Sequence, residues 1–492
     1  MLKTFIQSVT RQSGRFIKLG SPPLAVCPRC GSQSLSASTK SAAPKKSKAK
    51  SPGQIAAARK KKEAEYKVEI DSRISELDFP LGDYNLQISG RNPYLTTSGA
   101  PKKLFTSTRN FPGEMYIGNH EFANRVASLM SFSPSKPPLI VEGNPGMGLL
   151  TYAMLEKGAK KIRAFEGRAI FVYRLQAMQK HYGYDRLELV CPYNVFDYFK
   201  KSTKKLDLQI IAAMAKAEES APTDASADSP DFSPSTAPNK VGFSLEERLD
   251  LMLNPSKGEP QEWSDPVPAL KFVGVVPQRC ESVFLRRLLD NVAKRKGFCS
   301  LGRAEFFLLV SPRTYTMLTT QPGPKTNLQV FRWMSIAAQT FFDITALDTA
   351  PRSSLLPPVP KSKVEEASTQ WTLVRLTAKP DLPDLIDWTL LPEFIFFLKQ
   401  AMTARLKPVV QWLEGWIPGY GKKYLDQGNN MYIRTGDLTA HQWTELFRDI
   451  VTSGDYASSN LKIAFGTSGQ SLDVLDADED ELEDDKIVSS MG

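Results

Sequence analysis

Residues 139–148, Leu-Ile-Val-Glu-Gly-Asn-Pro-Gly-Met-Gly, combine an apolar run, an acid and a glycine-rich turn. The apolar run predicts a buried parallel strand, and residues Leu149 to Lys157 predict a helix directly after the turn. In a doubly wound α/β sheet, the crevice at the carboxyl end of such a strand holds nucleotide-like ligands. Gly146 and Gly148 would let the backbone approach a ligand closely. The alternative is an ordinary strand-to-helix turn, because glycine loops are common.

A second acid stands at the end of the next predicted strand, Lys161–Glu166. A carboxylate at this position can accept hydrogen bonds from the two ribose hydroxyls of an adenosyl ligand. Glu166 follows Glu142 by 24 residues, close to the interval expected of such a pair. The alternative role is that of an acid at a helix N-terminus, where the helix dipole favours negative charge. We favour the ribose-binding role, and both remain open at this point.

The rest of the pattern predicts the elements that position these residues. Further strands are predicted at 187–191, 270–276, 304–310, 341–347 and 369–376, and helices at 168–180 and 281–294. Another helix begins after Asn119, a residue type that favours the N-cap. From residue 382 onward the periodicity is helical, with helices at 391–404, 407–416 and 439–451. We therefore expect an α/β core followed by a small all-helical domain.

The spacing Glu-x-x-Pro-Gly-x-Gly differs from the dinucleotide fingerprint Gly-x-Gly-x-x-Gly. It resembles motif I of the S-adenosylmethionine-dependent methyltransferases, specifically of the rRNA adenine N6-dimethyltransferase family. The Pro-rich segment 353–361 is similar to the family's connection into its last strand. This resemblance covers about residues 100–378 and implies a class I, Rossmann-like methyltransferase core that uses S-adenosyl-L-methionine. The cofactor-binding residues implied by the resemblance are Glu142, Gly143, Gly146, Gly148, Glu166 and Asn194.

Two positions depart from the family pattern. Where the family has an acid after the third strand, for the amine of the cofactor's adenine, this chain has Asn194, which can accept one hydrogen bond. Strand four ends in Val275, Val276, Pro277 and Gln278, where active members carry Asn-Leu-Pro-Tyr or Asn-Leu-Pro-Phe. In those members an amide oxygen holds the amine of the target adenine, and an aromatic ring stacks on the flipped base. Val275 offers no acceptor and Gln278 no aromatic face, so we expect a retained fold without methylation chemistry.

Charge is concentrated at the ends of the chain. The 492 residues carry a formal net charge of +10, but residues 1–62 alone contain 14 Lys and Arg and no acid. Their amphipathic, Ser-rich start predicts a mitochondrial presequence, and the alternative is a disordered basic tail or DNA-binding arm. Residues 473–486 hold nine acids and one base. Any nucleic-acid surface on the folded part is therefore a local patch.

Composition also limits the kinds of site, the cellular compartment and the domain organisation that the chain can have. Five cysteines without a regular spacing indicate a reducing compartment, and Cys27 and Cys30 form only half of a zinc-site pattern, so no metal is expected. No apolar stretch reaches the roughly 18 residues of a membrane span. The expected parts are a presequence and basic linker (1–62), a methyltransferase-like core (77–378) with a largely disordered insertion (202–266), a helical C-terminal domain (382–470) and an acidic, disordered tail (471–492).

Aromatic residues alternate with lysines in the predicted C-terminal domain, at Trp412, Trp416, Tyr420, Lys422 and Lys423. Such a pattern can bind single-stranded nucleic acid, although tryptophans at positions i and i+4 are more often core residues. We expect Trp412 to be buried and the lysines to be exposed. Local charge suggests eight nucleic-acid contacts, each of which by itself is more often an ordinary solvated side chain: Lys102, Lys103, Arg286, Arg287, Arg295, Lys296, Lys422 and Lys423.

The presequence together with the altered strand-four site resembles the branch of the family that serves mitochondrial transcription. This resemblance implies a monomer in the nucleoid of the mitochondrial matrix, whose partners are the single-subunit mitochondrial RNA polymerase and melted promoter DNA. The alternative is an enzyme, a mitochondrial small-subunit rRNA adenine N6-dimethyltransferase. A third, weaker reading is a non-catalytic ribosome assembly factor that binds rRNA. The end of strand four distinguishes the transcription factor from the enzyme, because the enzyme should keep the Asn and the aromatic residue where this chain has Val275 and Gln278.

Overall fold

The computed structural model describes residues 88–89, 92–96, 114–132, 137–190, 194–196, 253, 260–323, 330–359 and 364–468. All of them belong to one compact unit within residues 66–492. The predicted presequence and basic linker, most of the predicted insertion and the acidic tail lie outside the described residues.

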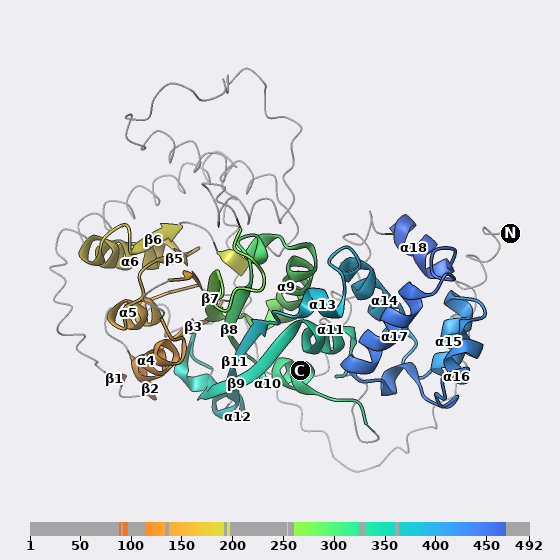
Figure 1. Ribbon diagram of the computed structural model, residues 1–492. Helices are drawn as coiled ribbons and strands as arrows, with labels where there is room; N and C mark the ends of the chain where they lie inside the picture. The colour runs from red at the N-terminus through yellow and green to blue at the C-terminus, as the bar shows by residue number, and fades with distance from the viewer. Residues whose placement is uncertain are drawn as a thin grey trace, which may run out of the picture. The chain divides into compact units, whose positions relative to one another are not determined.

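A seven-stranded mixed sheet forms the centre of this unit, in the order β6-β5-β4-β7-β8-β11-β9 (Figure 1). Neighbouring strands from β6 to β8 run parallel, and β11 is antiparallel to both β8 and β9. The strands are β4 (Leu139–Gly143), β5 (Ile162–Phe165), β6 (Leu187–Val190), β7 (Leu270–Val275), β8 (Ala304–Val310), β9 (Phe342–Pro351) and β11 (Gln370–Ala378). This arrangement confirms the predicted α/β, Rossmann-like methyltransferase class.

Helices cover both faces of the sheet because successive strand residues point to opposite sides. In β7, Phe272 packs in the same core cluster as α9, whereas Val273 packs in the cluster that contains α4 and α5. The helices of this part are α4 (His120–Leu129), α5 (Leu149–Glu156), α6 (Ala169–Tyr182), α9 (Glu281–Lys294), α10 (Pro312–Thr319), α11 (Trp333–Phe341) and α12 (Val364–Ser368). As predicted, Asn119 caps α4, where its side chain accepts a hydrogen bond from the Phe122 N–H at 2.7 Å.

Short strands lie outside the main sheet. β1 (Ile88–Ser89) pairs with β2 (Asn92–Thr96), and β3 (Tyr116–Ile117) pairs with β10 (Leu355–Leu356). The β3–β10 pairing holds Tyr116 beside the glycine loop, as described below.

The C-terminal part is helical, as predicted. It comprises α13 (Leu382–Leu385), α14 (Leu391–Thr403), α15 (Val409–Trp416), α16 (Tyr420–Asp426), α17 (Ala440–Thr452) and α18 (Asn460–Ser468). Of these, α13, α16 and α18 were not predicted, since α13 and α16 have only four and seven residues and α18 shows no long apolar repeat. Helix α14 shares one continuous core with α9 and α11, and the rings of Phe394 and Phe341 lie 6.4 Å apart.

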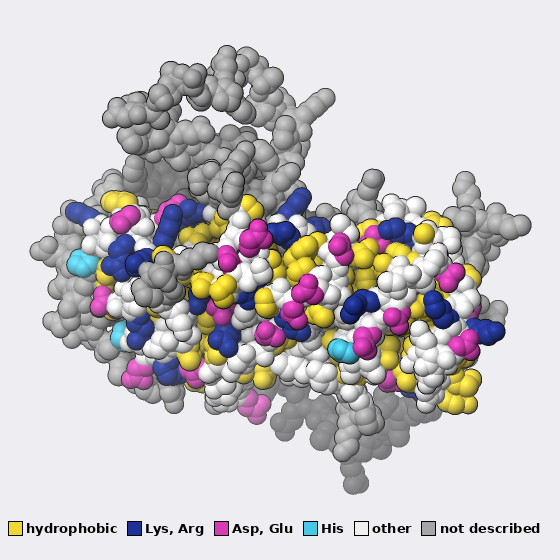
Figure 2. All heavy atoms as spheres, viewed as in Figure 1, with side chains coloured by type: hydrophobic (Ala, Val, Ile, Leu, Met, Phe, Trp, Pro, Cys, Tyr) yellow, Lys and Arg dark blue, Asp and Glu magenta, His cyan; other side chains and the backbone are white. Residues whose placement is uncertain are grey.

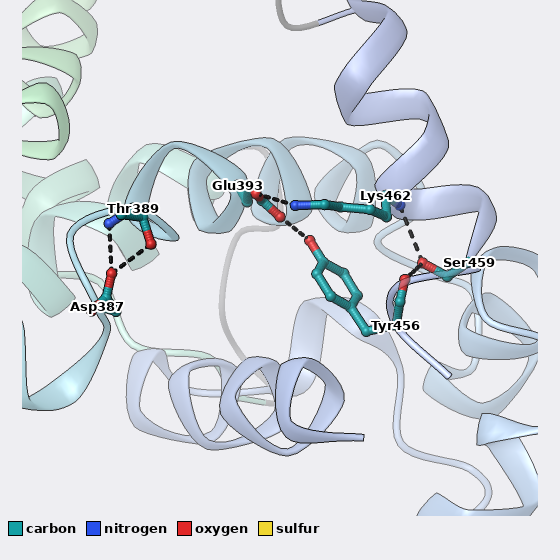
Figure 3. A network of polar contacts seen from close by, with 6 residues as sticks. All are labelled: Asp387, Thr389, Glu393, Tyr456, Ser459 and Lys462. Atoms are coloured by element: carbon teal, nitrogen blue, oxygen red, sulfur yellow. Dashed lines mark hydrogen bonds and ion pairs between the residues drawn. The ribbon is translucent and has the colours of Figure 1, made fainter. Parts of the chain in front are cut away.

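A buried carboxylate ties the last helix to α14 (Figure 3). Glu393 accepts hydrogen bonds from the Tyr456 hydroxyl and from Lys462 Nζ, the latter at 2.5 Å. Ser459 Oγ accepts from the Lys462 N–H at 3.2 Å, which orders the first turn of α18. The two ionised groups compensate each other, so Glu393 can be only 6% exposed.

Two predicted boundaries were wrong. Residues 260–266 were placed in the insertion, but Trp263 is buried and donates a hydrogen bond to the Lys379 carbonyl at 2.9 Å. A strand was predicted from Phe341 to Leu347, yet α11 continues through Phe341 and β9 extends to Pro351. β9 is an edge strand with mostly exposed or half-buried residues, so it lacks the apolar run that marks central strands. Among the described helices, none has the length and apolarity needed to cross a bilayer.

Candidate functional site

The glycine loop lies at the carboxyl end of β4, next to the end of β7. Gly143 of β4 is paired with Gly274 of β7, so the predicted loop and the altered strand-four site are neighbours in space. Gly146 and Gly148 adopt φ values of +59° and +77°, in the left-handed region that glycine tolerates best. Helix α5 then begins at Leu149. The structure therefore has the loop geometry that the sequence predicted.

Glu166, the candidate ribose acceptor, is fully buried and makes two hydrogen bonds to backbone. Its Oε2 accepts from the Gly146 N–H at 2.9 Å, and its Oε1 accepts from the Arg168 N–H at 2.7 Å. Burial raises the pKa of this carboxyl to about 7, although the two backbone N–H donors oppose that rise. Glu166 therefore lies beside the glycine loop and bonds the N–H of Arg168, the residue just before α6.

Glu142 lies inside the protein and connects β4 to α5. It is 1% exposed, and its Oε2 accepts a hydrogen bond from the Thr151 hydroxyl at 2.6 Å. Burial raises its pKa to about 8; the Thr151 hydrogen bond lowers the pKa, and the nearby charge of Glu166 raises it further. Its position is that of a structural residue, which joins the end of β4 to the first turn of α5.

The remaining two predicted cofactor residues are packed against other side chains. Asn194 Oδ1 accepts from the Phe196 N–H at 2.9 Å, so it stabilises the turn after β6. A Cβ placed on Gly143 would lie 2.8 Å from Val195 Cγ1, which leaves no room on that side of the strand.

Tyr116 is a residue at this site that the sequence analysis missed. A Cβ on Gly146 would lie 2.6 Å from Tyr116 Cδ1, so the ring covers the glycine loop directly. The Tyr116 hydroxyl donates to Glu114 at 2.7 Å, and Glu114 also forms an ion pair with Arg168 at 2.6 Å. No local pattern marks this contact, because Tyr116 precedes the loop by 30 residues and reaches it through the β3–β10 pairing.

The fit of an adenosyl cofactor can be tested on these contacts. A ribose diol needs acceptors that it can reach. Each oxygen of Glu166 accepts one backbone N–H and keeps a second lone pair, but the side chain is fully buried, and Asn194 is buried as well. Asn144 differs, because its Nδ2 is buried and has no hydrogen-bond partner. One free donor does not replace the acceptors. In this arrangement the predicted cofactor residues offer no exposed acceptor to a ribose, although the loop has kept its shape.

The end of β7 lacks groups that could hold a base. Val275 and Val276 are 2% and 1% exposed, and the Val276 N–H donates to the Leu309 carbonyl at 3.2 Å. Gln278 is exposed and begins a short 3₁₀ turn, Gln278–Cys280. The described side chains at this strand end thus offer neither a buried amide nor an aromatic platform.

The six described residues among the predicted nucleic-acid contacts lie on or just after α9 and on α16. Lys102 and Lys103 lie outside the described residues. Arg286 and Arg287 are half-buried on α9, and the Arg295 guanidinium lies 5.2 Å from the Trp388 ring centroid. The other three are exposed, at the end of α9 and on α16: Lys296, Lys422 and Lys423. Helix α9 packs against α11 and α14, whereas α16 packs against α15.

The aromatic residues near Lys422 and Lys423 belong to the core. As expected, Trp412 is buried, and Tyr420 and Tyr424 are only 1% and 4% exposed. They are therefore unavailable for stacking on bases. The lysines themselves are exposed, which leaves them able to contact phosphate.

A different surface of the C-terminal part carries exposed aromatic and basic side chains. Two loops run side by side there, since the Val409 N–H donates to the Ile433 carbonyl at 2.8 Å and the Thr435 N–H to the Lys407 carbonyl at 3.0 Å. Tyr432 is 76% exposed and Leu406 63%. We call this the 405–434 surface: Arg405, Leu406, Lys407, Met431, Tyr432 and Arg434. The sequence pattern did not single it out, because the two loops meet only in the folded chain.

Within the described part of the chain, no group of His, Cys, Asp and Glu side chains could hold a metal ion. Cys27 and Cys30 lie outside it.

Comparison with known proteins agrees with this geometry. The family model described as ribosomal RNA adenine dimethylase matches residues 106–451. The chain is similar to the mitochondrial dimethyladenosine transferase 2 of Drosophila melanogaster, with 23% identity over 78% of this chain and 86% of the relative. The Homo sapiens protein of the same name is 25% identical over 73% of this chain and 82% of the relative.

Two solved structures are also similar. The dimethyladenosine transferase from Plasmodium falciparum has a TM-score of 0.42 at 13% identity, covering 68% of this chain and 97% of that one. The 23S rRNA methyltransferase ErmE has a TM-score of 0.39 at 14% identity, covering 68% and 98%. The family uses S-adenosylmethionine, and the match spans both the sheet and most of the C-terminal helices. The chain belongs to the ribosomal RNA adenine dimethylase family.

Proposed function

We propose that this protein is a mitochondrial transcription initiation factor that helps the single-subunit mitochondrial RNA polymerase to melt promoter DNA and to hold the open complex. The observation that carries the proposal is the end of β7, where Val275 and Gln278 provide neither an acceptor for an adenine amine nor a ring to stack on it. The internally bonded Glu166 supports it further, since a factor of this kind needs no methyl donor. We place the protein in the nucleoid of the mitochondrial matrix, as a monomer, because the relatives named above are mitochondrial.

The energetics of melting are compatible with the surfaces described. Opening a duplex costs about 1.4 kcal/mol per base step. Stacking of one unpaired base on an aromatic side chain contributes about 1–3 kcal/mol of binding free energy. Phosphate contacts stabilise the open DNA further. The 405–434 surface offers Tyr432 as the stacking residue, with Lys407 and Arg434 exposed beside it. Lys422 and Lys423 would add phosphate contacts.

Run-off transcription with the cognate polymerase tests the proposal. We expect transcription from a closed linear promoter to depend strongly on this protein, and transcription from a template with a pre-melted start site to depend on it much less. Equal polymerase activity with and without the protein on both templates would overturn the proposal.

The alternative function is that of a mitochondrial small-subunit rRNA adenine N6-dimethyltransferase. The names of the relatives favour it, since they describe dimethyladenosine transferases. An assay of labelled methyl transfer from S-adenosylmethionine to the ribosomal hairpin distinguishes the transcription-factor function from the methyltransferase function. We expect no transfer above background, and turnover at the rate of an active family enzyme would establish the alternative.

A further inference from the structure

The methionines within the described residues are buried, with one exception. Five of them belong to one core cluster and three to the other, and each of these eight is at most 9% exposed. The ninth, Met431, is 53% exposed. A thioether in the core is shielded from dissolved oxidants, whereas a thioether at the surface is open to them. Met431 is therefore the described methionine that can be oxidised while the chain stays folded.

Met431 lies at the tip of a turn whose backbone is held in place. The Ile433 N–H donates to the Asn430 carbonyl at 3.3 Å, so Met431 and Tyr432 are the two central residues of a β-turn. The Asn430 side chain supports this turn, since its Oδ1 accepts from the Tyr432 N–H at 2.9 Å. The Ile433 carbonyl in turn accepts from the Val409 N–H of the facing loop at 2.8 Å. The two exposed side chains are thus carried next to each other on a fixed backbone.

The surface around this turn is apolar as well as basic. Leu406, on the facing loop, is exposed like Met431 and Tyr432, and Lys407 and Arg434 are exposed beside them. Isolated exposed apolar side chains are ordinary, but these three stand on two loops that are bonded to each other. Figure 2 shows hydrophobic side chains, in yellow, at the surface of the end of the molecule that Figure 1 labels α15 and α16. Met431 therefore belongs to the apolar contact area of the 405–434 surface.

The chemistry of the thioether suits contact with a nucleobase. Methionine is flexible and polarisable, and its sulfur packs favourably against aromatic rings. Every nucleobase presents an aromatic face, so the base that stacks on Tyr432 offers such a ring to the neighbouring Met431. A sulfoxide in the same place is polar and chiral. Its oxygen would have to lose bound water to make the same apolar contact, which costs free energy.

We infer that Met431 is a site of reversible oxidation, and that its oxidation by hydrogen peroxide weakens the binding of single-stranded nucleic acid to the 405–434 surface. The sulfur lone pair attacks one peroxide oxygen, an S–O bond forms and the O–O bond breaks. The second oxygen takes the proton of the first and leaves as water, so the sulfur loses two electrons and the peroxide gains them. The inference rests on the proposed function, since that proposal assigns strand binding to this surface.

Mass spectrometry of the full chain after peroxide treatment tests where oxidation occurs. We expect the sulfoxide of Met431 to form at least about tenfold faster than that of any of the eight buried methionines, because only Met431 is exposed among them. Thermal melting before and after treatment checks that the oxidised protein remains folded. Equal rates at Met431 and at the buried methionines would overturn the inference.

Titration of a fluorescent single-stranded oligonucleotide tests what the oxidation does. We expect the wild-type protein to bind about three- to tenfold more weakly after treatment. Methionine sulfoxide reductases A and B, one for each epimer, should restore its affinity. M431L has a side chain of similar volume without sulfur, so its affinity should be the same before and after treatment. M431Q is polar without oxidation and should bind more weakly than M431L. Both variants should fold, because the substituted side chain is exposed.

The inference is overturned if the oxidised wild-type protein keeps its affinity, or if treatment weakens M431L as much as the wild type. The second result would assign the effect to another methionine or to a cysteine. These outcomes are distinct from failure of the proposed function. A protein that does not stimulate the polymerase but binds single strands in a peroxide-sensitive way would lose the transcription role and keep the oxidation site. Stimulated transcription together with peroxide-insensitive strand binding would give the reverse.

Discussion

Glu166 Oε2 accepts a hydrogen bond from the Gly146 N–H at 2.9 Å, so the acid that follows β5 is bonded to the loop that follows β4. In a methyltransferase site these two groups would face a ligand. Here they satisfy each other, and Tyr116 covers the loop from the other side. A ligand could reach this carboxylate only if the residues that cover it moved, because Glu166 is fully buried. The loop residues Gly143 to Gly148 are themselves buried, so the loop packs as part of the protein core.

Replacing Gly146 by Ala should destabilise the protein by about 2–4 kcal/mol. The new Cβ would lie 2.6 Å from the Tyr116 ring, and the backbone has a positive φ. Gly158→Ala is the matched control, since Gly158 also has a positive φ but nothing lies within 4 Å of its Cβ position. It should cost only about 1 kcal/mol. Urea unfolding measures both, and equal losses would contradict the close contact between Tyr116 and the loop.

Stability should fall as the pH rises from about 5 to about 8. Glu142 and Glu166 have pKa values raised to about 8 and about 7 by burial, against 4.5 as the ordinary value. In this window the unfolded chain has released these protons and the folded chain still holds them, so each carboxyl contributes a loss of up to about 1.4 kcal/mol per pH unit. Glu142→Gln keeps an acceptor for Thr151 and should flatten the curve. Glu121→Gln on the exposed side of α4 should leave the curve unchanged, and an identical slope in both variants would contradict the assignment.

Replacing Tyr432 by Ala should weaken binding of a short single-stranded oligonucleotide about tenfold, because one base loses its stacking partner. The side chain is 76% exposed, so the free energy of unfolding should not change. Tyr432→Phe retains the ring and should retain the affinity. Fluorescence titration measures all three proteins. If the Ala variant binds as tightly as the wild type, the 405–434 surface does not stack on bases.

Replacing Glu393 by Ala should destabilise the C-terminal helices by about 2–4 kcal/mol. The change leaves the buried Tyr456 hydroxyl without its acceptor and removes the ion pair with Lys462. Asp387→Ala is the control, since Asp387 is exposed and bonds only Thr389 among the residues of Figure 3. It should leave the free energy of unfolding nearly unchanged. Limited proteolysis should show cleavage around α18 in the Glu393 variant first, and resistance equal to the control would contradict this role.

The sequence by itself determined the elements whose signals are local. The apolar run at 139–141 and the glycine spacing predicted β4 and its loop, and the period of the apolar residues predicted α9 from Glu281 to Lys294. Asn119 predicted the start of α4. The loss of acceptor and ring at Val275 and Gln278 was also evident, because residue type alone decides what a side chain can donate, accept or stack.

Only the tertiary structure decided which of these groups are available to a ligand. Trp412 and Tyr432 are both aromatic residues of the C-terminal part, yet one is buried and the other exposed. Glu166 was predicted to face a ribose, but its partners are backbone N–H groups, one of them 20 residues away. Such contacts join residues that are distant along the chain, and their free energies depend on burial and geometry that no local pattern contains.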